Sequence, residues 1–227
     1  MINSTQKWWG LTAVAILCFA SSAFANSGTL TMTSAGSNVL HGVYVGPYYA
    51  TVNGVANTPV ICDDFADDSV VGHTWNFNSN SFSTLGSALW GSQTSNYEAA
   101  AWLTLQMLSL NSNPNNATQV AYLSFAIWSL FDKNALNSLT STQLAAVNSW
   151  LSQVPSNLTP SQFSNFVLLT PQGCTNGPGS CPGQEFFLVT PEGGSAMLYL
   201  LLAGLACLGG LLFRRRGQTP AVGSRMA

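Results

Sequence analysis

The chain has 227 residues, which leaves room for one ordinary domain once two unusual terminal segments are set aside. Charged residues make up 6% of the chain, against roughly 25% in a typical soluble protein, and this argues against a cytosolic protein. Between the terminal segments Lys133 alone faces eight acidic residues, a net charge of about −7. Nucleic-acid binding needs a basic stripe that displaces counterions from phosphates, so this class is excluded.

The first 25 residues have the pattern of a cleavable export signal. Lys7 precedes an apolar run from Trp8 to Ala20, and the small residues after it end in Ala23-Phe24-Ala25, an Ala-x-Ala cleavage site. A membrane anchor is the alternative, but this run is shorter than the roughly 20 apolar residues that cross a bilayer. We therefore predict a signal peptide over residues 1–25, removed after Ala25.

Residues 28–82 predict β-structure. They are rich in Thr, Val, Tyr and Gly, and stretches such as Val43-Tyr44-Val45 and residues 48–52 favour strands. Asn53-Gly54 follows the second stretch, and Asn-Gly between apolar runs indicates a hairpin because both turn positions tolerate positive φ.

An acidic turn follows the last apparent strand of this region. Four carboxylates lie within six positions, at Asp63, Asp64, Asp67 and Asp68. Oxygen-rich clusters are what Ca²⁺ selects, so these residues form a candidate metal site, although the ligand spacing of an EF-hand is missing. The sequence favours the alternative, a solvated acidic turn. A glycosidase site is not favoured, because its two acids must stand apart across a cleft.

Residues 96–132 change to helical spacing, and Pro114 interrupts them, so we predict two packed helices. A third helix is predicted over residues 140–151, capped by Thr140 or Ser141 and ended before Pro155. Residues 163–169 and 186–189 are predicted as closing strands. The fold class is α+β, with a β-rich N-terminal part packed on a small helical bundle. The part of the chain between the terminal segments has five tryptophans, which we assign to the core rather than to a sugar-binding face: Trp75, Trp90, Trp102, Trp128 and Trp150.

The predicted ectodomain, residues 26–189, contains Cys62, Cys174 and Cys181. Cys174 and Cys181 flank a flexible loop, T-N-G-P-G-S, so we predict a disulfide between them, as an oxidising compartment permits. A zinc site is the rival assignment, but the spacing is not Cys-x-x-Cys and no histidine is near.

Residues 196–213 carry no charge, and Arg214, Arg215 and Arg216 follow directly. This pattern predicts one C-terminal transmembrane helix with residues 217–227 as a cytoplasmic tail, since basic residues stay inside. A buried core helix is the alternative, but such a helix normally has a polar face and this segment has none.

The segment Thr190-Pro191-Glu192-Gly193, the apolar helix and the three arginines together resemble the PEP-CTERM sorting signal of bacterial surface proteins, here over residues 190–216. The resemblance implies processing near Pro191 and Glu192 by an exosortase, a membrane-embedded cysteine transpeptidase. The sequence departs from the family pattern because Gly193 replaces the second proline and a tail follows the arginines. An unprocessed single-pass protein is the alternative.

Cys62 lies in P-V-I-C-D-D-F, and the segments Y-E-A-A-A-W-L and S-F-A-I-W-S-L-F-D follow downstream. This trio resembles a class of PEP-CTERM ectodomains and, faintly, the thioester adhesion domains of surface proteins. That resemblance implies a thioester between Cys62 and a glutamine, but Ser124 occupies the matching position and Gln119 lies five residues earlier. A buried, inert Cys62 is the alternative.

Together these features predict an exported, non-enzymatic cell-surface or extracellular-matrix protein, structural or adhesive, that is membrane-anchored in transit. The alternative is an adhesin that binds glycan or couples covalently through Cys62. We expect no cofactor, and Ca²⁺ at the acidic turn is the alternative. The expected partners are the membrane, an exosortase-like transpeptidase and extracellular polysaccharide.

Overall fold

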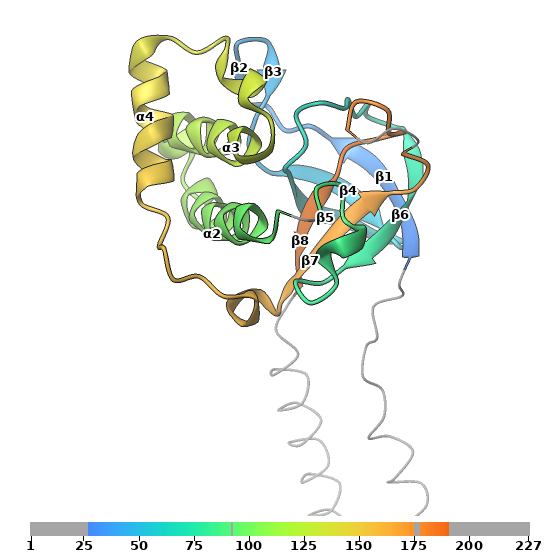
Figure 1. Ribbon diagram of the computed structural model, residues 1–227. Helices are drawn as coiled ribbons and strands as arrows, with labels where there is room; N and C mark the ends of the chain where they lie inside the picture. The colour runs from blue at the N-terminus through green and yellow to red at the C-terminus, as the bar shows by residue number, and fades with distance from the viewer. Residues whose placement is uncertain (1–26, 92, 175–177, 191–227) are drawn as a thin grey trace, which may run out of the picture. The chain divides into compact units, whose positions relative to one another are not determined.

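The computed structural model describes residues 27–91, 93–174 and 178–190 (Figure 1). Contacts divide the chain into two units, Met1–Val189 and Thr190–Ala227. The centre of the first unit is a closed antiparallel barrel with strand order β1-β4-β5-β8-β7-β6. Its strands are β1 (Ser27–Ser34), β4 (Tyr48–Val52), β5 (Val55–Cys62), β6 (Thr74–Asn80), β7 (Phe166–Pro171) and β8 (Phe186–Val189).

Along the barrel strands, buried side chains that fill the interior alternate with side chains that face outwards. In β4, Tyr48, Ala50 and Val52 are buried while the residues between them are partly exposed, as expected for a strand with one face on the core. In β8, Phe186 contacts Tyr48 and Trp75, whereas its neighbour Phe187 contacts Tyr97 on the helical side. Strand β8 therefore links the barrel interior to the helices.

The Asn53-Gly54 turn joins β4 to β5, as predicted. Asn53 has φ of 49° and Gly54 has φ of 83°, so both turn residues adopt the left-handed region. The Asn53 side chain also accepts a hydrogen bond from the Thr29 backbone N–H at 3.0 Å, which ties the turn to β1.

The helices come between β6 and β7 in the chain and lie on one side of the barrel (Figure 1). They are α2 (Thr94–Asn111), α3 (Ala117–Phe131) and α4 (Ser141–Ser152), with short 3-10 turns η3 (Leu85–Ser87), η4 (Pro114–Asn116), η5 (Lys133–Leu136) and η6 (Pro160–Phe163). Pro114 opens the turn that separates α2 from α3, and Thr140 caps α4 through a capping box with Gln143.

The predicted α+β class, with a β-rich N-terminal part, is confirmed, as are the two helices broken at Pro114 and the third helix. The strand predicted to start at Phe163 starts at Phe166, because η6 precedes it. The helix predicted over residues 196–213 lies outside the described residues. Within the described ranges, no helix combines the length and apolar character that a membrane span needs.

The barrel has two distinct ends. Ser27 pairs with Asn78, and Val189 pairs with Phe166, so the described chain starts and finishes at the same end, which we call the terminal end. Tyr48 and the end of β5 lie at the opposite end, the distal end. The distal end also carries the small hairpin of β2 (Val39–Leu40) and β3 (Val43–Tyr44) (Figure 1).

Candidate functional site

The acidic turn after β5 enters the interior at the distal end. Asp63 and Asp64 are fully buried, Asp67 is 6% exposed, and Asp68 is exposed. The expectation of a solvated acidic turn is therefore wrong for Asp63, Asp64 and Asp67. The physical reason is that the chain continues beside β8 past Cys62, with the Asp63 N–H donating to the Glu185 carbonyl at 3.4 Å.

Asp63 and Glu185 form a buried acid pair. The Glu185 carboxylate accepts hydrogen bonds from the Tyr97 hydroxyl at 2.6 Å, from the Leu89 N–H at 3.0 Å and from the Thr170 hydroxyl. Both carboxyl oxygens of Asp63 are buried. Two acids buried side by side favour a form in which one of them holds a proton.

The pKa values of both acids are raised because the pair is buried and no Lys or Arg of residues 27–190 is buried with it. Burial first, and the facing Glu185 charge second, raise the pKa of Asp63 well above its usual value. Burial also raises the pKa of Glu185, although its hydrogen-bond donors oppose the rise. Lys133 is the sole Lys or Arg of residues 27–190, and it is exposed. A neutral Asp63 beside the Glu185 carboxylate is thus the form that this interior favours.

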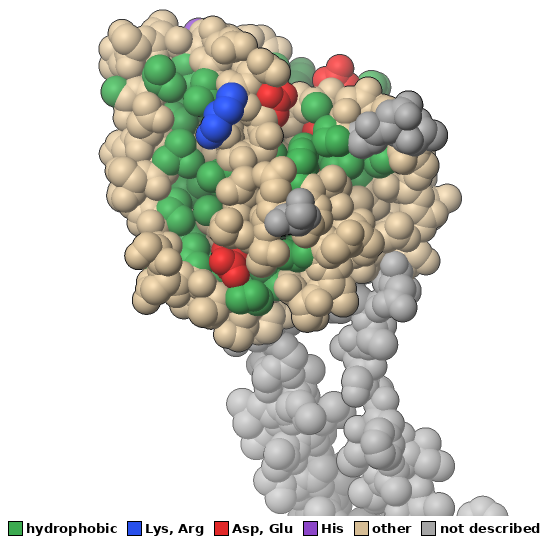
Figure 2. Space-filling model, viewed as in Figure 1, with side chains coloured by type: hydrophobic (Ala, Val, Ile, Leu, Met, Phe, Trp, Pro, Cys, Tyr) green, Lys and Arg blue, Asp and Glu red, His purple; other side chains and the backbone are tan. Residues whose placement is uncertain are grey.

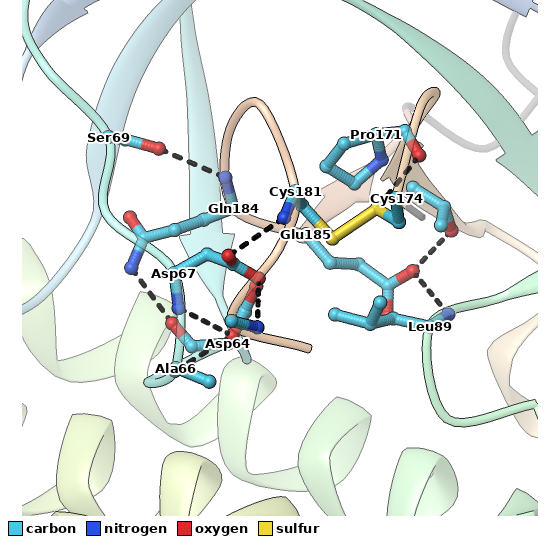
Figure 3. Close-up of a disulfide and its surroundings, with 12 residues drawn as sticks. Asp64, Ala66, Asp67, Ser69, Leu89, Pro171, Cys174, Cys181, Gln184 and Glu185 are labelled. Atoms are coloured by element: carbon cyan, nitrogen blue, oxygen red, sulfur yellow. Dashed lines mark hydrogen bonds between the residues drawn. A yellow bond between two sulfur atoms is a disulfide. The ribbon is translucent and has the colours of Figure 1, made fainter. Parts of the chain in front are cut away.

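Asp64 and Asp67 form a second pair, which fastens the disulfide loop (Figure 3). Asp67 accepts hydrogen bonds from the N–H groups of Gly179 at 2.9 Å and Cys181 at 3.0 Å. Asp64 accepts from the N–H groups of Ala66 and Asp67 at 2.9 and 3.2 Å. Burial, and after it the Asp67 charge, raise the pKa of Asp64 to about 7.

The predicted disulfide between Cys174 and Cys181 is present. Because these two sulfurs bond to each other, neither serves as a zinc thiolate. The disulfide lies beside the acid pairs, since Cys181 donates to Asp67 and Glu185 follows four residues later (Figure 3). Gln184 also links the chain after Cys181 to the acidic turn, because its Nε2 donates to the Asp64 carbonyl at 2.8 Å.

Cys62 lies in the core, where its Sγ donates to the Asp64 carbonyl at 2.9 Å. Burial, with the charges of Asp64 and Asp63, raises the pKa of the thiol, so the reactive thiolate is disfavoured. Gln119 is exposed on α3, and its amide oxygen accepts from the Trp150 indole at 3.0 Å. The buried Ser124 hydroxyl accepts from the Gly46 N–H at 2.8 Å. The structure thus gives Cys62 and Gln119 separate partners and does not bring them together.

The four aspartates do not form one set of metal ligands. Asp63 lies beside Glu185, Asp64 lies beside Asp67, and Asp68 is exposed. Over residues 27–91, 93–174 and 178–190, no three His, Cys, Asp or Glu side chains are grouped as a metal site would require.

Sequence reasoning missed three members of the buried cluster: Tyr97, Thr170 and Glu185. Tyr97 lies in the first turn of α2, Thr170 lies on β7, and Glu185 directly precedes β8, so no local spacing joins them. One available signal was Glu185 itself, a charge placed directly before an apolar strand in a chain with few charges. Of the expected core tryptophans, Trp75 and Trp128 are buried, whereas Trp90, Trp102 and Trp150 are partly exposed.

The cluster is closed to substrate, because Asp63 and Glu185 have no exposed surface. A pocket of about 350 Å³ lies nearby, and two of its lining residues, Thr170 and Leu89, donate hydrogen bonds to the buried Glu185 carboxylate. Within the cluster, Asp63 and Glu185 are placed to share a proton. Comparison of this chain with protein-family models, with curated proteins and with solved structures found no match.

Proposed function

We propose that this chain is an exported cell-surface or extracellular-matrix protein of structural or adhesive type, membrane-anchored in transit and processed at its C-terminus by an exosortase-like transpeptidase. The observation that carries the proposal is the position of the barrel within the chain. Strand β1 starts at Ser27, two residues after the expected cleavage site at Ala25, and β8 ends at Val189, two residues before Pro191. Removal of both terminal segments would leave every barrel strand in place.

Two further features support export. The Cys174–Cys181 disulfide suits an oxidising compartment, because cytosolic thiols are kept reduced. The folded part also has few charges, and blue and red atoms occupy little of the face shown in Figure 2. A surface of uncharged Ser, Thr and Asn side chains hydrates well, and it offers no strong field for nucleic acid or other highly charged partners.

The test is fractionation of the native host with and without its exosortase-like enzyme, followed by mass spectrometry of the protein. We expect surface material that begins at Asn26 and lacks any peptide containing Arg225. In cells without the enzyme, the Arg225 peptide should persist in the membrane fraction. A matched variant, Glu192→Ala, should accumulate in the same unprocessed form, because the resemblance places processing at Pro191 and Glu192.

Two outcomes would count against the proposal in different ways. Mature surface material that retains the Arg225 peptide would defeat processing and leave a single-pass anchor. Soluble protein inside the cell, with residues 1–25 still attached, would defeat export itself. Of the two adhesive mechanisms, glycan binding has the stronger support, since Cys62 is buried and Gln119 bonds elsewhere.

A further inference from the structure

A second pocket, of about 230 Å³, opens at the distal end of the barrel between the β2–β3 hairpin and the loop after β5. Aromatic rings provide much of its lining: Tyr44 on the hairpin, Tyr48 at the start of β4, Phe65 in the loop and Trp128 on α3. Polar groups from Asp68, Ser69 and Gln184 complete the lining. The pocket thus combines flat apolar faces with a few groups that form hydrogen bonds.

The aromatic groups differ in how far they are buried. Tyr48 and Trp128 are 7% and 2% exposed, so they form a rigid floor, and Trp128 is fixed by its indole N–H, which donates to the Cys62 carbonyl. Phe65 packs against Trp128, with their ring centroids 5.4 Å apart. Tyr44 is 51% exposed, so a large part of its ring is open to a ligand.

The hairpin that carries Tyr44 is held in place. The Tyr48 hydroxyl donates to the Tyr44 carbonyl at 2.7 Å, and the Val45 N–H donates to the Asn38 carbonyl at 3.0 Å. At the hairpin tip, His41 shares a hydrogen bond of 2.8 Å with Gln143 on α4. The rim of the pocket is therefore ordered before a ligand arrives, which lowers the entropy cost of binding.

Charge and size restrict the ligand. Asp68 brings a carboxylate to the pocket, and the single Lys of residues 27–190 is not among its lining residues, so anionic ligands are disfavoured. The volume is below the range of about 300 to 1,000 Å³ typical of drug-sized ligands, so the pocket admits one small ring. A neutral sugar fits this chemistry, because one face of its ring is apolar C–H surface and its hydroxyls pair with carboxylate, hydroxyl and amide groups.

We propose that this pocket binds one residue of a neutral glycan, with the sugar ring stacked on Tyr44 and its hydroxyls bonded to Asp68, Ser69 and Gln184. The inference deepens the adhesive form of the proposed function by naming a ligand class. The pocket lies at the barrel end opposite Ser27 and Val189.

The test uses the full-length protein in a detergent without a sugar headgroup. The probes are the methyl glycosides of glucose, galactose and N-acetylglucosamine, with methyl glucuronide as the anionic comparison. Saturation-transfer NMR identifies binding, and titration gives its Kd. We expect saturable binding of at least one neutral glycoside and weaker binding of the glucuronide.

Variants locate the binding. Tyr44→Ala should weaken binding by about tenfold, whereas Tyr44→Phe, which retains the ring, should stay within about twofold. Val55→Ala is the matched control, because Val55 is similarly exposed but lies on β5 near the terminal end. The proposal is overturned if no neutral probe binds saturably, or if Tyr44→Ala binds as the parent chain does. Binding is measured on purified protein, so its failure would leave the fractionation result on export untouched.

Discussion

A carboxyl group buried without a cation is most stable when it holds a proton, and Asp63 and Asp64 both meet this condition. Each faces a second carboxyl group, Glu185 for Asp63 and Asp67 for Asp64. The partner carboxylate has donors of its own, such as Tyr97 for Glu185 and the Cys181 N–H for Asp67. Burial therefore raises the pKa of Asp63 and of Asp64, and both groups couple folding to pH.

The raised pKa of Asp64 makes the folded chain less stable as the pH rises. Its pKa is about 7 in the folded chain and about 4 in an unfolded chain. Folding therefore takes up a proton between these values, so the stability from this group is complete below about pH 4 and falls as the pH rises towards 7. Thermal unfolding across this range should show higher stability under mildly acidic conditions.

Asp64→Asn should remove this part of the pH dependence. An asparagine keeps the acceptor for the Ala66 and Asp67 N–H groups and offers Asp67 a permanent donor. We expect the variant to exceed the parent chain by on the order of 2 kcal/mol near pH 7.5 and to match it near pH 4. Asp68→Asn, at an exposed position of the same loop, is the control. An unchanged slope of unfolding free energy with pH in Asp64→Asn would contradict the assigned proton.

The β4–β5 turn depends on its own two residues, Asn53 and Gly54, which both have positive φ. Gly54 has φ of 83°, and a side chain there is strained even though no atom lies within 4 Å of the position that its Cβ would take. Gly54→Ala should lower the free energy of unfolding by about 1 kcal/mol, measured in denaturant. Gly86→Ala is the matched control, because its surroundings are equally open and its φ is not positive. Equal losses in both variants would show that backbone strain is not the cause.

The sequence predicted such elements because their causes are local. Asn53-Gly54, Pro114 and the Thr140 cap each act within a few residues, and the structure has a turn, a helix break and a helix start at these positions. Closure of the barrel was not predicted, because it depends on β5 pairing with β8 across more than a hundred residues. The same long-range pairing brings Asp63 beside Glu185, which is why the acidic turn was expected in solvent. The disulfide was predictable because its two cysteines flank one short loop.

Strand β8 closes the barrel. It pairs with β5 on one side and β7 on the other, and Phe186 and Phe187 have no exposed surface. Its first residue also follows Glu185, the acceptor of the buried cluster. The last described strand thus completes the sheet, the core and the acid pair together, although it is only four residues long.

Two truncations should therefore behave very differently. A chain of residues 26–190 keeps β8 and should unfold in one cooperative transition, as material processed at Pro191 would need to do. A chain of residues 26–184 loses β8 and Glu185, so β5 and β7 are left with unpaired edges and Tyr97 loses its acceptor. We expect this shorter chain to lack a cooperative transition by circular dichroism and to aggregate. A cooperative transition in the shorter chain would show that the barrel does not depend on β8, whereas failure of the longer chain would show that residues beyond Thr190 are needed for folding.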